Sequence, residues 1–284
     1  MIGWGASWVN VKVLSSYINE FEMVFFRFFI TAITMIPIII FLKKSFKIDF
    51  KSFLLIVITS LAFIAYMKYF FLGTKLGTAS LAGAFVTTLI PINTFLILAL
   101  LRVKKICKKD IFALALGGVG VLTILNIWSF GINQILVIQN LYFILASILW
   151  PIITILSSKS SKISPIVFTF YLYIVTVILD VVFFMDVSQI KFSSFDSIFW
   201  INIFILTIVG TTFANTVYFL GIEKLGASEV SSFIFLVPFA AILLSGIFLK
   251  ETISTSIIIG TVLTLLSVKI LNDIKFFKSK ESSC

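Results

Sequence analysis

Four polar side chains recur at matching positions in the two halves of the chain. Tyr66 and Asn215 are 149 residues apart, and so are Tyr69 and Tyr218. All four lie in long apolar stretches, where a polar group without a hydrogen-bond partner is costly. The recurrence therefore predicts either a polar cavity lined by both halves or hydrogen bonds between helices.

A cation and several aromatic rings extend this candidate site. Lys12 lies one helical turn after Trp8 on the same face of a predicted helix, Trp4 comes one turn earlier, and Trp150 answers Trp4 in the second half. The tryptophans could be cavity walls or anchors at the membrane interface. Donors and aromatic rings around one cation suit a zwitterion or an organic anion. The hydroxyl groups that could join such a site belong to Thr87, Thr88, Ser231 and Ser232.

Four further residues are predicted to be structural or to take part in gating. Arg27 would tie neighbouring helices together through its fork of donors. Pro91 and Pro238 interrupt the backbone hydrogen bonds of equivalent apolar stretches, which gives either a flex point or a tolerated kink. Glu251 is the polar end of the second of these stretches, where the first half has Lys104.

Lys68 and Asp180 also fall within apolar stretches. A charge there costs about 2.5–3.5 kcal/mol on insertion scales. The alternatives are a charged pathway through the membrane and a residue that snorkels or forms a structural pair near a helix end. For both residues the second interpretation is favoured.

The composition excludes several classes of function. The 284-residue chain has no histidine, which removes histidine-ligated zinc, haem held by histidine and Ser-His catalysis. It has no glycine-rich phosphate loop either. We therefore expect no cofactor, no metal and no enzymatic activity. The net charge is +10, but the basic residues lie in short clusters between apolar stretches, which is typical of a membrane protein rather than a nucleic-acid-binding one.

Membrane-spanning helices must position these side chains. Hydrophobic residues make up 60% of the chain and charged residues 12%, about half the charge of a soluble domain. The predicted fold class is an all-α integral membrane protein with ten transmembrane helices, because most apolar stretches have the roughly 20 residues that cross a bilayer. The first stretch is shorter, which indicates a clipped or tilted helix. The stretches are residues 1–14, 21–42, 52–73, 79–101, 111–128, 137–157, 165–185, 197–221, 227–249 and 254–272.

The two halves are predicted to be inverted repeats. Residues 1–128 and 137–272 hold five stretches each, and residues 273–284 form a cytoplasmic tail. With the N-terminus inside, 16 of the 22 Lys and Arg residues fall in cytoplasmic loops, in the tail or, for Lys269, at the end of the last stretch just before the tail, and three fall outside. The positive-inside rule then places both termini in the cytoplasm of an inner-membrane protein. Because five is odd, the second half crosses the bilayer in the opposite sense to the first.

These features resemble the drug/metabolite transporter superfamily and its EamA-type members. The resemblance rests on residues 4–8 (Trp-Gly-Ala-Ser-Trp) with Lys12, on Arg27, on Trp150, on the paired prolines, and on residues 249–254 (Leu-Lys-Glu-Thr-Ile-Ser). It covers essentially the whole chain. Two departures stand out: residues 102–105 (Arg-Val-Lys-Lys) replace the Gly-Glu of the family, and the first stretch lacks the acid that related four-helix pumps use to exchange protons for cationic drugs.

The resemblance implies a secondary transporter that works by alternating access on a small-molecule substrate. We expect a monomer or homodimer in the lipid bilayer, driven by a proton or by the membrane potential, that exports small polar metabolites such as amino acids. Two alternatives remain open at this point. One is a flippase component for lipid-linked sugars, and the other is a membrane assembly factor or enzyme. No nucleic-acid partner is expected.

Overall fold

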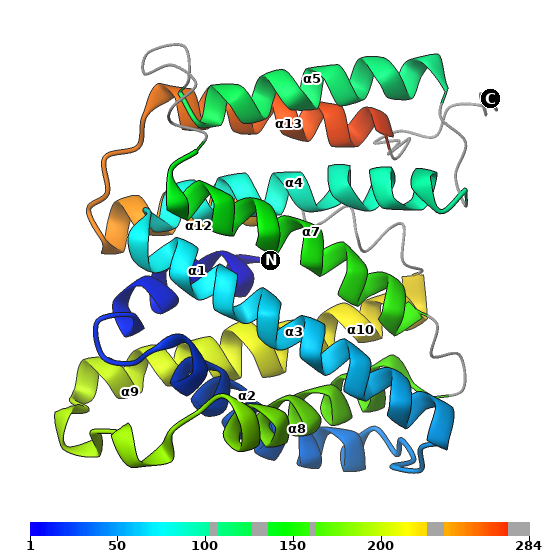
Figure 1. Cartoon of the computed structure of the whole chain (residues 1–284), viewed down its shortest axis with the longest axis vertical. Helices are drawn as coiled ribbons and strands as arrows, with labels where there is room; N and C mark the ends of the chain where they lie inside the picture. The colour runs from blue at the N-terminus through cyan, green and yellow to red at the C-terminus, as the bar shows by residue number, and fades with distance from the viewer. Residues whose placement is uncertain (103–106, 127–135, 159–162, 226–235, 272–284) are drawn as a thin grey trace.

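The computed structural model describes residues 1–102, 107–126, 136–158, 163–225 and 236–271 (Figure 1). Every regular element within these residues is a helix, which confirms the all-helical part of the predicted fold class. The helices are α1 (Ile2–Leu14), α2 (Glu20–Phe41), α3 (Phe50–Leu76), α4 (Ala79–Leu100), α5 (Lys108–Ile124), α7 (Ile138–Ser158), α8 (Pro165–Phe183), η2 (Val187–Gln189), η3 (Phe192–Ser194), α9 (Ser197–Phe204), η4 (Ile205–Phe213), α10 (Ala214–Leu225), α12 (Leu236–Phe248) and α13 (Thr255–Leu271).

Short polar side chains determine where several helices begin. The side chain of Asn19 accepts a hydrogen bond of 2.9 Å from the backbone N–H of Glu22, whose carboxylate accepts one of 2.8 Å from the N–H of Asn19. This reciprocal pair is a capping box, which satisfies backbone donors that the first turn leaves unpaired. Asp49 caps α3 and Asp196 caps α9 in a similar way.

Six of the described helical runs are long and apolar enough to cross a membrane. They are α2, α3, α4, α7, α8 and the run that begins with α9. Two shorter apolar helices, α12 and α13, follow them in the chain. A total of ten transmembrane helices therefore remains a prediction, while the membrane character of the protein is plain from these spans.

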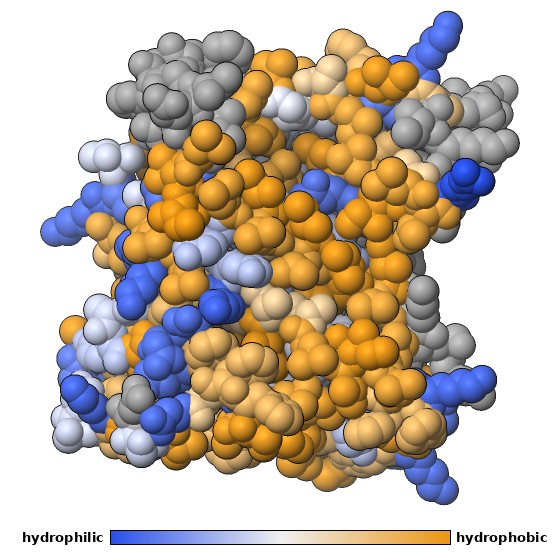
Figure 2. Space-filling view, in the orientation of Figure 1, coloured by the Kyte–Doolittle hydropathy of each residue, from blue (hydrophilic) through white to orange (hydrophobic). Residues whose placement is uncertain are grey.

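The outer surface of the helices is apolar. Leu100, Phe41 and Phe50 are between 78% and 85% exposed. Figure 2 shows apolar side chains over most of the visible face, with hydrophilic residues gathered chiefly toward its left and right sides. Lipid, rather than water, is the solvent that such a surface fits.

The two halves of the chain interleave instead of forming separate bodies (Figure 1). From the first half, α1 packs against α12 and η4, α2 packs against α8 and η4, and α3 packs against α7 and α8. The first helical run of each half thus lies against the third helical run of the other half. This exchange brings residues far apart in the sequence to one place.

The last helices of the two halves, α5 and α13, lie side by side through small residues. A Cβ atom on Gly260 would lie 2.5 Å from the carbonyl oxygen of Gly120, so both positions need the bare backbone. The hydroxyl of Ser267 also donates to the carbonyl oxygen of Ala113 at 2.5 Å. Close approach of this kind is how helices associate in lipid, where no hydrophobic force drives them together.

The third helical run differs between the halves. In the first half, α3 is one regular α-helix of 27 residues. In the second half, α9 and α10 are joined by η4, a π-helix of nine residues. π-helical turns are rare and are frequent at functional sites. They widen the helix locally, and here the wide part faces α1 and α2.

Candidate functional site

One cluster of polar and aromatic side chains joins α1, α8 and α10. The indole Nε1 of Trp4 donates a hydrogen bond of 2.9 Å to Oδ1 of Asn215. The amide nitrogen of Asn215 donates in turn to the hydroxyl of Tyr173. Tyr218, on the turn after Asn215, packs its ring against Trp4 with the ring centroids 5.0 Å apart. We call Trp4, Tyr173, Asn215 and Tyr218 the amide cluster.

The matching positions of the first half form a second cluster between α3 and α7. Tyr66 packs against Trp150 with the ring centroids 4.9 Å apart. Tyr69 stacks on Tyr142 with the centroids 5.8 Å apart. We call these four residues the aromatic cluster. One of its pairs corresponds to a pair of the amide cluster, because Trp150 meets Tyr66 where Trp4 meets Asn215, but Tyr69 meets Tyr142 where Tyr218 meets Trp4.

Two phenylalanine rings connect the clusters. Phe28 on α2 stacks on Tyr173 with the centroids 4.8 Å apart and lies 5.0 Å from the ring of Phe63 on α3. Phe63 in turn stacks beside Tyr66 at 6.1 Å. A continuous line of rings therefore runs between the two sets of repeated residues.

Arg27 lies beside both clusters. Its Nε donates a hydrogen bond of 3.1 Å to Oγ1 of Thr211 in η4, and its guanidinium carbon lies 5.4 Å from the centroid of the Phe28 ring. Tyr66 and Tyr173 also lie near the guanidinium, and the centroid of the Phe70 ring is 6.0 Å from its carbon. Among the described residues no carboxylate forms an ion pair with it. The arrangement is a half-buried cation surrounded by aromatic rings and hydroxyls.

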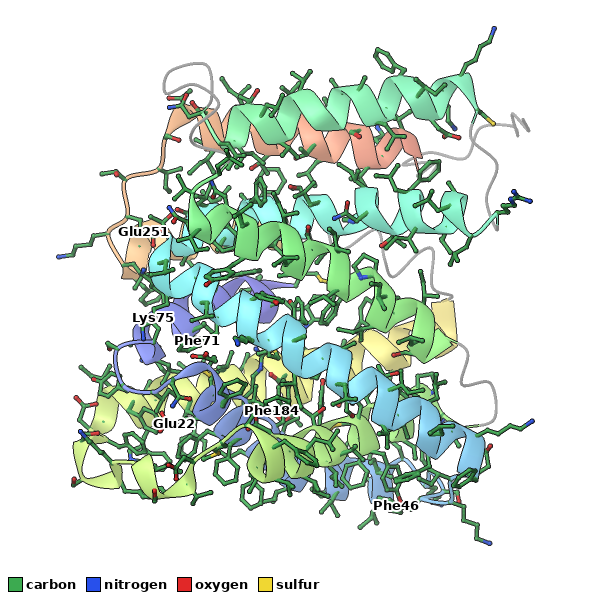
Figure 3. All side chains as sticks on the ribbon, in the orientation of Figure 1. Glu22, Phe46, Phe71, Lys75, Phe184 and Glu251 are labelled. Atoms are coloured by element: carbon green, nitrogen blue, oxygen red, sulfur yellow. The ribbon has the colours of Figure 1, made fainter. Side chains whose placement is uncertain are left out.

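The side chain of Lys12, on α1, contacts the turn between α3 and α4. Its Nζ donates to the carbonyl oxygens of Lys75 at 2.7 Å and Gly77 at 2.6 Å, which are among the last of α3. The carboxylate of Glu251 accepts from the backbone N–H groups of Ala79 at 2.7 Å and Ser80 at 2.9 Å, which begin α4. A cation at a helix C-terminus and an anion at a helix N-terminus both complement the helix dipole. Figure 3 shows Lys75 and Glu251 on the same side of the molecule.

The other predicted site residues lie as follows. Trp8 is 4% exposed, with its ring 4.4 Å from that of Phe70. The hydroxyls of Thr87 and Thr88 donate to the backbone of their own helix, to the carbonyls of Gly83 and Ala84. Pro91 lies inside α4 and Pro238 inside α12. Ser231 and Ser232 lie outside the described residues. A contact between any of these residues and a substrate stays a prediction.

Sequence reasoning missed Tyr173 and Thr211. Each is a hydroxyl residue in an apolar stretch, which is the signal that picked out Tyr66. Neither recurs at the spacing of 149 residues, because the corresponding positions hold Val24 and Ala62. The repeat therefore pointed to half of the polar contacts and overlooked those that only one half makes.

A family model decides what class of protein carries this site. The model of the EamA-like transporter family matches residues 1–126 and again residues 137–272. The chain belongs to the EamA-like transporter family. It is therefore a membrane transporter, and the resemblance stated from its motifs is confirmed.

Comparison with individual proteins adds the fold. One solved crystal structure aligns over 95% of this EamA-like chain and 94% of its own, with a TM-score of 0.62 and 17% sequence identity. At that identity the likeness shows the fold alone. No curated protein matches this chain.

Proposed function

We propose that this EamA-like protein is a secondary transporter for small metabolites that carry a carboxylate, such as amino acids, and that it exports them. The observation that carries the proposal is Arg27, a half-buried cation without a carboxylate partner among the described residues. A substrate carboxylate would supply that partner. Arg suits the task because its planar fork can bind both carboxylate oxygens at once.

The residues around Arg27 fit the rest of such a substrate. Asn215, Tyr173 and Tyr66 offer an amide and two hydroxyls, while Trp4 and Trp150 offer aromatic walls. The amide of Asn215 is already engaged on both of its polar atoms. A substrate that binds Asn215 would therefore replace one of these two hydrogen-bond partners. Binding is thus linked to a rearrangement between α1, α8 and α10.

Alternating access supplies the transport step in this proposal. The matching pairs Trp4 with Asn215 and Trp150 with Tyr66 support two inverted halves around a shared centre, since equivalent residues meet equivalent partners. Ten membrane crossings, cytoplasmic termini and a place in the inner membrane complete the proposal and follow from the distribution of Lys and Arg.

The test is uptake into proteoliposomes preloaded with a panel of unlabelled amino acids, their amides and simple amines. We expect labelled amino acids to exchange, and their amide and amine analogues to exchange at least about tenfold more slowly, as loss of a charge-assisted hydrogen bond implies. Arg27→Gln should lower the exchange of amino acids by about 10- to 100-fold. Asn202→Ala, on the same helical run as Asn215, serves as the control because its amide bonds only to its own helix. Equal exchange of amines and amino acids would contradict the proposal.

A further inference from the structure

Asp180 is a buried acid that the proposed transport site does not use. It lies three residues before the end of α8 and is 0% exposed. Neither of its carboxyl oxygens has a hydrogen-bond partner among the described residues. The hydroxyl of Thr176, one turn earlier on the same helix, is also buried without a partner there. Two unsatisfied oxygen groups thus lie four residues apart on one buried face of α8.

Native proteins pair nearly all of their buried polar groups, so such a pair needs an explanation. Sealing a negative carboxylate away from water without a partner costs far more free energy than sealing a neutral carboxylic acid. The conformation described here therefore suits Asp180 with a proton bound. A conformation that opens this face of α8 to water would suit the ionised form.

The described charged groups on the helices packed against α8 leave Asp180 without an ion pair. α8 packs against α2, α3 and α10. On α2 the carboxylate of Glu22 is held by the N–H of Asn19, and on α3 the Nζ of Lys68 lies 5.7 Å from the centroid of the Phe21 ring. None of the charged side chains that the structure describes on these helices lies within ion-pair distance of Asp180. The described ones are Glu20, Glu22 and Arg27 on α2, and Lys51, Lys68 and Lys75 on α3.

An aromatic pair closes the end of the interface where Asp180 lies. Phe21, in the first turn of α2, stacks on Phe184 with the ring centroids 5.5 Å apart. The backbone N–H groups of Phe184 and Met185 both donate to the carbonyl oxygen of Asp180, at 2.9 and 2.8 Å. α8 therefore ends within one turn of the acid, and the ring of Phe184 just beyond that end stacks on α2. Figure 3 labels Phe184 at this end of α8 and Glu22 at the start of α2.

The same face of α8 reaches the transport site. Tyr173, one turn before Thr176, accepts the hydrogen bond from Asn215 and stacks on Phe28 of α2. A movement of α8 away from α2 would separate Tyr173 from Phe28 and Phe21 from Phe184 together. One displacement would therefore break the contacts around the substrate site and expose the carboxyl group of Asp180 to water.

We propose that Asp180 is the proton-binding site that couples transport to a proton gradient. The proton binds the carboxylate when the face of α8 opens to water, and the neutral acid permits the face to close. This inference rests on the proposed function only for the step in which α8 moves with the substrate site. Proton binding at Asp180 is a separate property that can be measured without any substrate.

The substrate-free experiment uses the full-length protein in lipid nanodiscs. Intrinsic tryptophan fluorescence is followed from pH 4 to 9, because Tyr173 of α8 is linked to the indole of Trp4 through Asn215. We expect a transition in the wild type that is lost in Asp180→Asn and moved to another pH in Asp180→Glu. Asp186→Asn is the matched control, since Asp186 is exposed in the turn after α8, and it should keep the transition. Size-exclusion profiles establish that each variant is folded.

The transport arm uses proteoliposomes and labelled amino acids that the wild type accepts. Asp180→Asn should still exchange amino acids when the pH is the same on both sides of the membrane. It should no longer accumulate them when a pH difference is imposed. An unchanged fluorescence transition in folded Asp180→Asn, or wild-type accumulation by that variant, would overturn the inference. If the wild type transports no amino acid yet shows the Asp180-dependent transition, the proposed substrate class fails while the proton site stands.

Discussion

The third helical run of each half shows how one repeated sequence yields two different structures. In the first half, α3 continues without interruption, and Leu61 on it is 48% exposed to the surroundings. The corresponding residue of the second half is Gly210, which lies within the π-helix η4. A Cβ atom on Gly210 would lie 2.5 Å from the hydroxyl oxygen of Ser7 and 3.1 Å from the carbonyl oxygen of Gly3. The second run is therefore pressed against α1, while the first run faces lipid at the same position.

The close approach changes which hydrogen bonds the run can make. In η4 the hydroxyl of Thr211 donates to the carbonyl of Leu206, five residues earlier, and accepts from Nε of Arg27. The hydroxyls of Thr34 on α2 and Thr212 also share a hydrogen bond of 2.7 Å. The π-helix thus presents two threonines to α2. The asymmetry between the halves, rather than their similarity, therefore positions Arg27.

The largest effect is expected when Gly210 is replaced by leucine, the residue that the first half has at the equivalent position 61. Gly210→Leu forces four carbon atoms into the contact with Ser7 and Gly3, and overpacking of this kind costs about 1–3 kcal/mol or more. We expect the thermal unfolding temperature in detergent to fall by several degrees and transport to be lost. The reciprocal variant, Leu61→Gly, removes only an exposed side chain and should cost about 1 kcal/mol of helix propensity. Equal destabilisation by both variants would show that the close contact at Gly210 is unimportant.

A second exchange tests the two clusters. Asn215→Tyr places the residue of the aromatic cluster in the amide cluster and removes the bonds to Trp4 and Tyr173. Loss of two buried hydrogen bonds costs about 1–3 kcal/mol, so kcat/KM for amino-acid exchange should fall by about 10- to 100-fold. Tyr66→Phe, which keeps the ring against Trp150, should lower exchange less than threefold by the same reasoning. A larger loss in Tyr66→Phe would reverse the roles assigned to the two clusters.

A third exchange concerns the turn between α3 and α4. Glu251→Lys introduces the charge that the first half carries at this position, as Lys104. It removes two charge-assisted bonds at the start of α4 and places a cation at a helix N-terminus, which should cost about 1–3 kcal/mol. Glu251→Gln keeps one acceptor and should cost less. The measurement is the unfolding temperature of each variant, with Lys250→Gln, the exposed neighbour, as the control.

The smallest effect concerns the acids that begin the third runs, Asp49 and Asp196. The backbone N–H of Phe199 and then the hydroxyl of Tyr17 bind the carboxylate of Asp196, which lowers the pKa of Asp196 below its ordinary value. A lowered folded-state pKa contributes stability above the ordinary pKa, and this contribution is lost as the pH falls through the lowered value.

We therefore expect the unfolding temperature of the wild type to fall slightly below about pH 4, the ordinary range of an aspartate pKa. Asp196→Asn should be less dependent on pH in this range. Asp49→Asn provides the comparison in the other half. A difference between wild type and Asp196→Asn that grows toward low pH would have the wrong sign for this account.

Much of the architecture follows from local chemistry that a sequence displays. Apolar stretches of spanning length predicted helices, and the described residues contain helix in each stretch, although six runs meet the length and hydropathy of a membrane span. The spacing of 149 residues predicted that the recurring polar side chains line a shared cavity or form hydrogen bonds between helices. Asn215 forms such a bond with Trp4 and Tyr66 packs its ring against Trp150, while the cavity stays a prediction.

The placement of charges was harder to derive from sequence. Lys12 was predicted as a substrate contact, but its Nζ donates to two carbonyls at the end of α3. Its contact with a substrate remains a prediction. The turn that it binds lies more than 60 residues away in the chain, so periodicity contains no sign of the contact. Arg27 was predicted to tie helices together, and its bond to Thr211 joins α2 to η4.

The sequence by itself determined the helical class, the transporter family and the polar residues that the two halves share. These properties depend on composition, hydropathy and a repeated spacing, which are local or periodic. Only the tertiary structure decided that Arg27 lies beside Tyr173 and Thr211, and that Asp180 on α8 is buried without a hydrogen-bond partner among the described residues. Hydrogen bonding and burial depend on which helix faces which, and in a bilayer that choice is made by close contacts such as Gly210 against Ser7, which no single helix encodes.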